Sequence, residues 1–501
     1  MIKVAPSFSI NSKTAVLNEI TSRLAKKDAN LWGEKAAAEA AIRLDWVDLP
    51  STSRELLPTL DALSAWSREI GHENFILCGM GGSSLAPEVI AGHFKKELFI
   101  LDSTEPTQVA ELLKLDLEKS CIIIASKSGS TIETTSQKAL FEDALTKAGL
   151  EIKNHMVIVT DPESPLHHSA REDGLKVITA NPNVGGRFSA LSAFGLVPAA
   201  LIGVDVSLLL DDAADAAETF IAPDSSVVRV ASLLAEKEFA FARFYDGDSD
   251  HPGLADWIEQ LVAESTGKDG KGVLPIVLSR APKDRSKVIT FKDGDALSVT
   301  GPLGAQFIFW EWVTALLCFL LKVDPFNQPN VAESKERTGK ILSDWKNLTA
   351  SKGDLIDNCE VFATNAHNSL TEYLRELGTG EYLAVMAYLN RNADKRLIEI
   401  REILEAKLKL PITFGWGPRF LHSTGQFHKG GPLVGTFLQI TSTPDLNLEI
   451  PGAGYGFERL ILAQALGDNE ALASRGLKVM RIDIKNREAG IEQLLREVAK
   501  L

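Results

Sequence analysis

"SCIIIASKSGSTIETTSQKALFEDALTKAGL" spans residues 120–150 and carries the pattern that decides the fold. Residues 121–125 form an uninterrupted apolar run, which is typical of a strand buried on both faces of a sheet. Residues 131–150 alternate apolar and charged positions as an amphipathic helix does. Small polar residues lie between the two. A strand that enters a helix through a short polar loop is the repeating unit of a parallel α/β fold.

The same unit recurs on both sides of this stretch. Short apolar runs at "NFILCG" (74–79), "ELFILD" (97–102), "HMVIVTD" (155–161) and "LKVITA" (175–180) are separated by segments with helical patterning. Strands that alternate with helices predict a parallel sheet covered on both faces. Ligands of such sheets bind outside the carboxyl ends of the strands.

A second α/β region follows a mostly helical stretch. Its predicted strands lie at "GVLPIVLS" (272–279), "YLAVMAYL" (382–389), "GTFLQIT" (435–441) and "KVMRIDI" (478–484). A chain of 501 residues is too long for one hydrophobic core, so two or more domains are expected. We predict a helical N-terminal segment at 1–70, a first α/β domain at 71–200, a helical connection at 201–265, a second α/β domain at 266–485 and a C-terminal helix at 486–501.

Composition and charge exclude several classes of protein. A net charge of −14 argues against broad binding of nucleic acid, which requires a basic face. The N-terminus lacks the apolar core of a signal peptide. The apolar run at 307–321 contains Glu311 and is shorter than a membrane span, so it predicts a buried helix and no membrane partner. The four cysteines are far apart in sequence, which predicts reduced thiols in a cytoplasmic protein.

Two glycine- and serine-rich loops follow predicted strands, at "GMGGSSLAP" (79–87) and "SKSGSTIET" (126–134). Glycines allow a ligand to approach the backbone closely, and the start of a helix offers unpaired N–H groups to an anion. The simpler interpretation is that the hydroxyls only cap a helix, and Ser130 with Glu133 fits a capping box. Two such loops together favour a phosphate-binding site.

The first loop also resembles a dinucleotide-binding fingerprint. Gly79 and Gly81 follow a strand, and Asp102 ends the next strand, about 20 residues on. The position of the third glycine holds Ser84, however, and the serine-rich second loop has no role in such a site. A nicotinamide-dependent dehydrogenase is therefore the weaker interpretation.

Charged residues further along the chain are ambiguous one by one. Arg187 follows two glycines in "NVGGRFSALS" (183–192), where a surface arginine is the ordinary interpretation. Glu333 lies in the turn-rich "FNQPNVAESK" (326–335), where an exposed loop glutamate is the ordinary one. His422 and His428 are six residues apart, which does not match the spacing of zinc ligands on a helix. We therefore predict no metal site there.

In combination and in this order, "GMGGSS", "SKSGSTIET", "GGRFS" and "NQPNVAESK" resemble the motifs of phosphoglucose isomerases. The similarity is closest to the isomerase half of bifunctional transaldolase/phosphoglucose isomerases, because of the segments at 253–275, 420–432 and 455–468. The resemblance implies an α/β fold with two sugar-isomerase (SIS-type) αβα sandwich domains, parallel sheets, and helical N-terminal and connecting segments.

The resemblance also implies an activity. The family interconverts glucose 6-phosphate and fructose 6-phosphate through a cis-enediolate, in glycolysis and gluconeogenesis, with no metal or organic cofactor. Relatives often dimerise, so a homodimer is the default. By resemblance, Glu333 is the carboxylate base, Arg187 stabilises the enediolate, and His422 or His428 assists ring opening. The implied substrate-binding residues are Gly82, Ser83, Ser126, Lys127, Ser128, Thr131 and Gln426.

Two departures from the family pattern leave alternatives open. The ring-opening histidine lies in a "GQH" context in the family, but here Gln426 is followed by Phe427, so His422 and His428 are both candidates. Ile461 stands where a lysine is expected, and Arg459 is a poor substitute because its pKa is too high for easy proton exchange. The alternative function is a sugar-phosphate-binding or regulatory protein with weak or no isomerase activity. The motifs do not separate one hexose phosphate from another.

Overall fold

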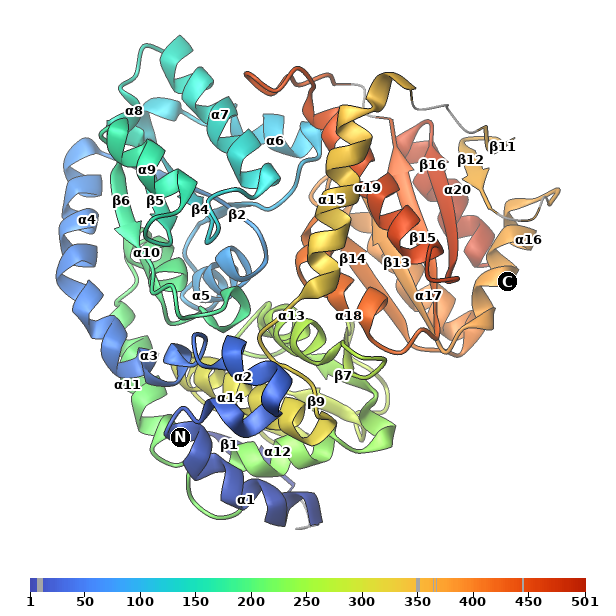
Figure 1. Ribbon diagram of the computed structural model, residues 1–501. Helices are drawn as coiled ribbons and strands as arrows, with labels where there is room; N and C mark the ends of the chain where they lie inside the picture. Colours follow the sequence, from blue (N-terminus) through green and yellow to red (C-terminus); the bar gives the residue numbers. More distant parts are fainter. Residues whose placement is uncertain (7–11, 348–351, 364, 366, 444–445) are drawn as a thin grey trace. The chain divides into compact units, whose positions relative to one another are not determined.

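The computed structural model describes residues 1–6, 12–347, 352–363, 365, 367–443 and 446–501 (Figure 1). Contacts within the chain divide it into two compact units. Unit 1 consists of Met1–Asp102 and Leu112–Asn327, and unit 2 consists of Ser103–Glu111 and Gln328–Leu501.

The first sheet of unit 1 has five strands, all parallel, in the order β3-β2-β4-β5-β6. They are β2 (Asn74–Gly79), β3 (Phe99–Leu101), β4 (Ser120–Ala125), β5 (Met156–Thr160) and β6 (Lys176–Thr179). The chain goes from β2 out to β3 and then returns to β4 on the other side of β2. The carboxyl ends of β2 and β4 therefore form a topological switch point, where open α/β sheets bind ligands. The predicted parallel sheet is confirmed.

Helices cover this sheet because its central strand is apolar on both faces: every residue of β4 is buried. Helices α5 (Leu85–His93) and α7 (Ile132–Lys147) follow the two glycine- and serine-rich loops, and α7 packs on β2 and β4. The other helices of unit 1 up to residue 201 are α1 (Ser12–Ala25), α2 (Glu34–Ala40), α3 (Leu49–Thr52), α4 (Leu57–Ile70), α8 (Ile152–His155), α9 (Pro165–Glu172) and α10 (Ala193–Leu201).

Unit 1 contains a second sheet that the sequence did not predict as part of this unit. Its order is β1-β10-β9-β7-β8, and only β1 pairs antiparallel. The strands are β1 (Lys3–Ala5), β7 (Phe241–Tyr245), β8 (Leu274–Val277), β9 (Val288–Thr290) and β10 (Ser298–Thr300). Strand β7 lies inside the predicted helical connection, and β8 lies inside the predicted second domain. Strand β8 was predicted as a strand at 272–279, but β1, β7, β9 and β10 were not, because they are short and local patterning does not identify them.

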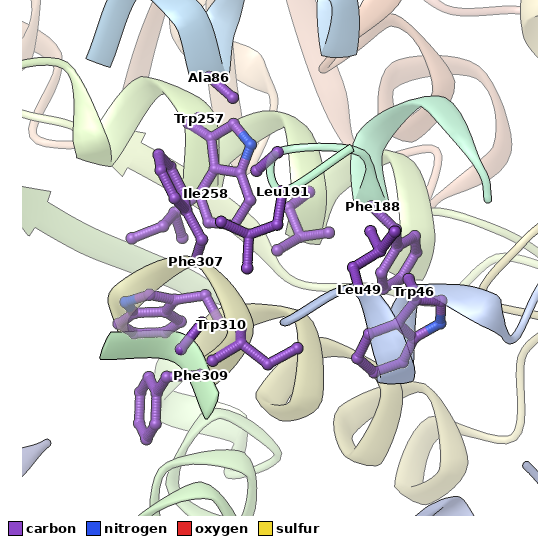
Figure 2. Close-up of a cluster of buried hydrophobic side chains, with 14 of the residues drawn as sticks. Trp46, Leu49, Ala86, Phe188, Leu191, Trp257, Ile258, Phe307, Phe309 and Trp310 are labelled. Carbon is purple, nitrogen blue, oxygen red and sulfur yellow. The ribbon is translucent and has the colours of Figure 1, made fainter. Parts of the chain in front are cut away.

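The core of unit 1 is rich in aromatic side chains (Figure 2). Trp257 packs edge-on against Phe307 with ring centroids 4.9 Å apart, and Trp46 lies 5.0 Å from Phe188. The helices around this core are α11 (Val206–Ala217), α12 (Ser226–Leu234), α13 (Leu254–Thr266) and α14 (Leu303–Leu321).

Helix α14 corresponds to the long apolar run of the sequence. The helix has 19 residues, so it extends beyond the predicted run at 307–321. By length and composition alone it could cross a membrane. Its most apolar window is 89% buried inside the protein, as expected for the core helix of a globular unit. The helix carries Glu311, whose side chain is fully buried.

Unit 2 is built on one mixed sheet of six strands in the order β11-β12-β16-β15-β13-β14. The strands are β11 (Asp354–Ile356), β12 (Cys359–Phe362), β13 (Tyr382–Ala387), β14 (Ile412–Trp416), β15 (Gly435–Ser442) and β16 (Lys478–Ile484). Strands β13 to β16 are parallel, whereas β11 and β12 form an antiparallel extension. The helices are α15 (Pro329–Ser343), α16 (Leu370–Arg375), α17 (Glu399–Leu408), α18 (Gly425–Gly430), α19 (Phe457–Ala473) and α20 (Arg487–Val498).

A short segment of the predicted first domain belongs to unit 2. Residues Ser103–Glu111, which include most of α6 (Pro106–Leu112), are held by contacts with the C-terminal half of the chain. Thr104 donates to the Gln464 side chain at 2.6 Å, and Glu105 forms an ion pair with Arg487. Unit 2 therefore consists of two segments that are far apart in sequence, and only their contacts in the folded chain bring them together.

Candidate functional site

The loop after β2 is held against a second glycine turn. A Cβ atom on Gly82 would lie 1.9 Å from the carbonyl oxygen of Gly186, so no side chain fits at position 82. Ser83 is buried, and Ser84 donates to the Asp102 carboxylate at 3.4 Å. The glycine at position 82 is thus required for close contact with the turn that carries Arg187.

The loop after β4 gathers hydroxyl groups at the N-terminus of α7. Ser126 donates to the Thr131 hydroxyl at 3.2 Å, and the Ser128 hydroxyl lies 3.5 Å from the same atom. The predicted capping box is wrong: the N-cap residue is Thr131, and Ser130 instead donates to Ser128 at 3.2 Å. The hydroxyls are therefore grouped with one another at the helix start, where an anion would be favoured.

Lys127 already has an anionic partner that the sequence did not indicate. Its ammonium group forms an ion pair with Asp161 and donates to the Pro182 carbonyl at 3.1 Å. Burial lowers the pKa of Lys127 and raises the pKa of Asp161, although each group partly offsets the shift of the other. A phosphate bound at this loop would share Lys127 with Asp161.

Arg187 is buried, with only 3% of its surface exposed, so it is not a surface arginine. It lies in a short 3-10 turn, Gly186–Phe188, and its guanidinium contacts α13 through Ser265 at 2.7 Å and Glu264 at 3.2 Å. It also donates to the carbonyl of Asn327 at 3.2 Å. Because these contacts come from separate segments, the orientation of the guanidinium is fixed.

Lys268 is a second buried cation beside Arg187, and sequence reasoning missed it. Burial, together with the positive charge of Arg187, lowers the pKa of Lys268 to about 7. Its ammonium group donates to the carbonyl of Asp324. The only signal in the sequence is its position in "TGKDGKG", a glycine-rich segment next to α13.

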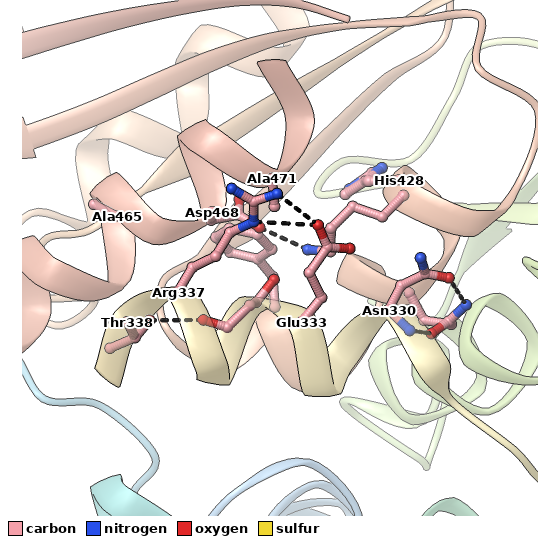
Figure 3. Close-up of polar contacts among 12 residues, drawn as sticks. Asn330, Glu333, Arg337, Thr338, His428, Ala465, Asp468 and Ala471 are labelled. Atoms are coloured by element: carbon pink, nitrogen blue, oxygen red, sulfur yellow. Dashed lines mark hydrogen bonds and ion pairs between the residues drawn. The ribbon is translucent and has the colours of Figure 1, made fainter. Parts of the chain in front are cut away.

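Glu333 lies on helix α15, not in a loop as its turn-rich surroundings had indicated. Two arginines hold its carboxylate, as Figure 3 shows in part: Arg337 lies 2.9 Å from Oε1, and Arg475 contacts both oxygens, at 3.1 Å from Oε1 and more closely at Oε2. Hydrogen bonds from Arg475 hold the pKa of Glu333 below its ordinary value, and Arg337 acts in the same direction. Glu333 is therefore ionised at neutral pH, as a general base must be.

His428 is a buried residue of α18, and Figure 3 draws it together with Glu333. Its ring stacks on Tyr382, and its Nδ1 atom lies 3.0 Å from the tyrosine hydroxyl. Burial lowers the pKa of His428 to about 3, so the ring is neutral at physiological pH. His422 is only half-buried, at the end of the 3-10 turn Arg419–His422.

Gln426 connects α18 to the start of α15. Its fully buried side chain accepts a hydrogen bond from the Asn330 backbone at 3.0 Å and donates to the Asn330 side chain at 2.8 Å. This pair of bonds fixes the N-terminal turn of the helix that carries Glu333. A role in positioning Glu333 is thus visible for Gln426, whereas contact with substrate stays a prediction.

The position of the expected lysine is buried. Ile461 is buried in α19, with 3% of its surface exposed, and Arg459 lies over the Trp345 ring at 5.2 Å. An ion pair two turns further along α19 is fully buried: Lys429 Nζ lies 2.6 Å from Asp468. The amine of Lys429, which belongs to α18, is thus already paired with a carboxylate.

Comparisons with known proteins agree with these motifs. Residues 61–248 match the family model described as Phosphoglucose isomerase, which includes both glycine- and serine-rich loops and Arg187. The chain is 36% identical over 273 residues to a glucose-6-phosphate isomerase of Thermus thermophilus, with 51% of this chain and 64% of the relative aligned. It is 29% identical over 386 residues to a glucose-6-phosphate isomerase of Mycoplasmopsis pulmonis, with 60% and 90% aligned.

Solved structures share the fold. A hypothetical protein of Thermus thermophilus aligns with a TM-score of 0.57 and 26% identity, over 70% of this chain and all of that one. A glucose-6-phosphate isomerase of Chlamydia trachomatis aligns with a TM-score of 0.55 and 17% identity, over 69% and 89%. The predicted sugar-isomerase architecture is confirmed, whereas the closer resemblance to bifunctional enzymes stays a prediction. The chain is thus similar to phosphoglucose isomerases, and its residues 61–248 match the model of that family.

Proposed function

We propose that the protein is a glucose-6-phosphate isomerase, which interconverts glucose 6-phosphate and fructose 6-phosphate in glycolysis and gluconeogenesis. The observation that carries the proposal is the chemistry of Glu333: an ionised carboxylate, fixed by two arginines, on a helix in the segment that resembles the family's base motif. A base that moves a proton between two carbons has to be ionised and held in one orientation.

In the proposed reaction, Glu333 removes the proton from C2 of the open-chain aldose. The electron pair forms the C1–C2 double bond, and the C1 carbonyl becomes the enediolate oxygen. A proton moves from the C2 hydroxyl to the C1 oxygen of the enediolate, and the carboxylic acid of Glu333 then returns its proton to C1, so that the C2 oxygen becomes the ketone carbonyl. Arg187 would stabilise the negative charge of the enediolate, because a preorganised guanidinium does so without reorganising. The proposed reaction requires no metal or organic cofactor.

For the phosphate, we propose the loop after β4. Ser126, Ser128 and Thr131 supply hydroxyl donors at the start of α7, and Lys127 supplies the positive charge. Lys127→Met should therefore raise the KM for fructose 6-phosphate by about tenfold or more while kcat changes less, because it removes one charge-assisted contact.

For ring opening, we favour His422 over His428. A histidine whose pKa is about 3 and whose Nδ1 already lies within hydrogen-bond distance of the Tyr382 hydroxyl is poorly suited to donate a proton near neutral pH. His422→Gln should lower the turnover of the cyclic sugar, whereas the turnover of a sugar that cannot form a ring should be unaffected. Equal losses with both substrates would contradict this assignment.

The remaining proposals concern partners and compartment. We propose a cytoplasmic protein that acts on a free sugar phosphate and binds neither nucleic acid nor membrane. All four cysteines are buried free thiols, as expected in a reducing compartment. We also propose a homodimer, by analogy with the family, and light scattering in solution measures the mass.

The decisive experiment is a coupled assay. Fructose 6-phosphate is supplied, and the glucose 6-phosphate formed is oxidised by an NADP-dependent dehydrogenase. Glu333→Gln should lower kcat by about 10²- to 10⁴-fold with little change in Tm, since it removes the proton transfer. Glu336→Gln, an exposed residue on the same helix, is the matched control and should be unaffected.

Two outcomes would refute the proposal: no turnover by folded wild-type protein, or unchanged turnover in Glu333→Gln. In the first case, calorimetry with fructose 6-phosphate distinguishes a sugar-phosphate-binding protein from an unrelated function. Incorporation of deuterium at C2 of recovered glucose 6-phosphate in D₂O is an independent sign of the enediolate step.

A further inference from the structure

A cluster of metal-ligating side chains lies outside the residues assigned to the isomerase reaction. Among the residues that the structure describes, Glu163, His167 and His168 offer ligand atoms that all lie within 4.8 Å of one another. His168 Nε2 is 3.3 Å from Glu163 Oε2, and His167 Nδ1 is 4.0 Å from Glu163 Oε1. The three residues belong to the start of α9 and the turn before it.

The backbone of this turn directs Glu163 over the helix. Glu163 has a φ of +61°, a left-handed conformation that is uncommon for a residue other than glycine. Ser164 caps α9, because its hydroxyl accepts a hydrogen bond from the His167 N–H at 3.0 Å, and Pro165 occupies the first helical position. The carboxylate and the two imidazoles therefore meet on one side of the first helical turn.

The turn is also held from the sheet side. The Thr160 hydroxyl lies 2.8 Å from the Ser164 hydroxyl and donates to the Ser126 carbonyl at 2.6 Å. Gly129, in the loop after β4, packs against Leu166. A Cβ atom added to Gly129 would lie 2.9 Å from the Leu166 backbone nitrogen. These contacts fix the backbone that carries the ligands, so little order has to be gained when an ion binds.

The nature and spacing of these ligands select the ion. In a tetrahedral zinc site with bonds of about 2.0–2.1 Å, ligand atoms are separated by about 3.3 Å. The separation between Glu163 and His168 equals this value. His167 Nδ1 lies within 4.8 Å of the other ligand atoms and accepts a long hydrogen bond from the Glu163 N–H at 3.4 Å, so the exposed Glu163 and His168 side chains have to move toward it when an ion binds. Two imidazoles and one carboxylate suit Zn²⁺, whereas Mg²⁺ and Ca²⁺ prefer oxygen ligands.

We propose that Glu163, His167 and His168 form a binding site for a transition-metal dication, with Zn²⁺ as the first choice. Three protein ligands leave the fourth position for water or another small ligand. The site is separate from the isomerase proposal, since none of its residues has a role in the reaction, and either proposal can fail without the other.

The test is calorimetric titration of the full-length protein, freed of metal with a chelator, with ZnCl₂ near neutral pH. Wild-type protein should bind one zinc ion at this site. In the variants His168→Gln and Glu163→Gln, the affinity for this zinc ion should fall at least about tenfold. Both side chains are exposed, so the variants should fold normally. MgCl₂ should give no binding at this site.

The matched control is His367→Gln. His367 contacts the carboxylate of Glu376, so it supplies one imidazole and one carboxylate without a second imidazole. This variant should bind Zn²⁺ as the wild type does. With Co²⁺ as a spectroscopic probe, a visible absorption band should form in the wild type and in the control and be lost in His168→Gln. Equal zinc affinity in wild type, His168→Gln and Glu163→Gln would overturn the proposal, and so would the absence of zinc binding.

Discussion

Replacement of Glu311 by glutamine is expected to stabilise unit 1 increasingly as the pH rises. Glu311 lies on the core helix α14 with 0% of its surface exposed, and neither carboxyl oxygen has a hydrogen-bond partner among the described residues. Burial raises the pKa of Glu311 well above its ordinary value of 4.5. The folded protein therefore keeps a proton at position 311 that the unfolded chain releases.

The sign of the effect follows from this difference in bound protons. Below the unfolded pKa of 4.5 the side chain is neutral in both states, and its contribution to stability is full. As the pH rises toward the folded pKa, the unfolded state becomes more favourable by about 1.4 kcal/mol per pH unit. The isosteric Glu311→Gln variant does not ionise, so above pH 4.5 the wild type should lose about 1.4 kcal/mol per pH unit relative to it, for as long as Glu311 stays protonated in the folded protein.

The expected change in melting temperature depends on the size of unit 1. For roughly 320 residues, an unfolding entropy of about 2.1 cal/mol/K per residue gives a relative shift of about 2 °C per pH unit over which Glu311 stays protonated. Scanning calorimetry measures it directly. Six of the eight tryptophans belong to unit 1, so tryptophan fluorescence assigns the transition to this unit.

The control is Glu69→Gln, which replaces an exposed glutamate on α4 and should give a Tm difference that does not depend on pH. Parallel Tm curves for wild type and Glu311→Gln would refute the reasoning, because they would mean that Glu311 is ionised in the folded protein. Infrared spectroscopy provides a second check: the carbonyl band of a protonated carboxylic acid should be present at neutral pH in the wild type and weaker in the variant.

Three further predictions concern the candidate site. Gly82→Ala should destabilise unit 1 by about 1–3 kcal/mol and lower turnover, because its Cβ would meet a carbonyl at 1.9 Å, whereas Gly186→Ala, with nothing within 4 Å of its Cβ, should melt close to the wild type. Equal Tm values for the two variants would contradict the proposed contact. Arg475→Gln should raise the pKa of Glu333 toward 4.5, which a ¹³C NMR titration of the carboxyl group measures; an unmoved titration would show that Arg475 does not hold the base. Ile461→Lys should lower the Tm without raising kcat, because it places an amine at a site that is 3% exposed, and a higher kcat would show that the family's lysine was the missing group.

Local patterning was sufficient for the first parallel sheet and the strands β13, β15 and β16. Apolar runs such as the one in β4 identify buried strands, because parallel strands covered on both faces have few polar positions. Patterning failed for β7, which is short, and for the assignment of β8, because strand pairing depends on contacts that are distant in sequence. The division at Asn327 and the transfer of Ser103–Glu111 to unit 2 are consequences of packing.

For the candidate site, the sequence indicated residue types but not their surroundings. Lys127 was recognised as a charge in a phosphate-like loop, and its ion pair with Asp161 was not. Glu333 was recognised from its motif, whereas its place on a helix and its contact with Arg475 come from the folded chain. The missed partners lie tens to hundreds of residues away, where no spacing rule applies.

By itself, the sequence determined the resemblance to phosphoglucose isomerases, the parallel α/β architecture, and the two loops whose glycines and hydroxyls suit a phosphorylated ligand. These properties are written in short stretches, since a strand, a turn and a helix start each depend on neighbouring residues. The tertiary structure decided the protonation of the key groups: Glu333 is ionised because two arginines contact it, and His428 is neutral because it is buried. Solvent exposure and nearby charge control a pKa, and both are set by residues that only the folded chain brings together.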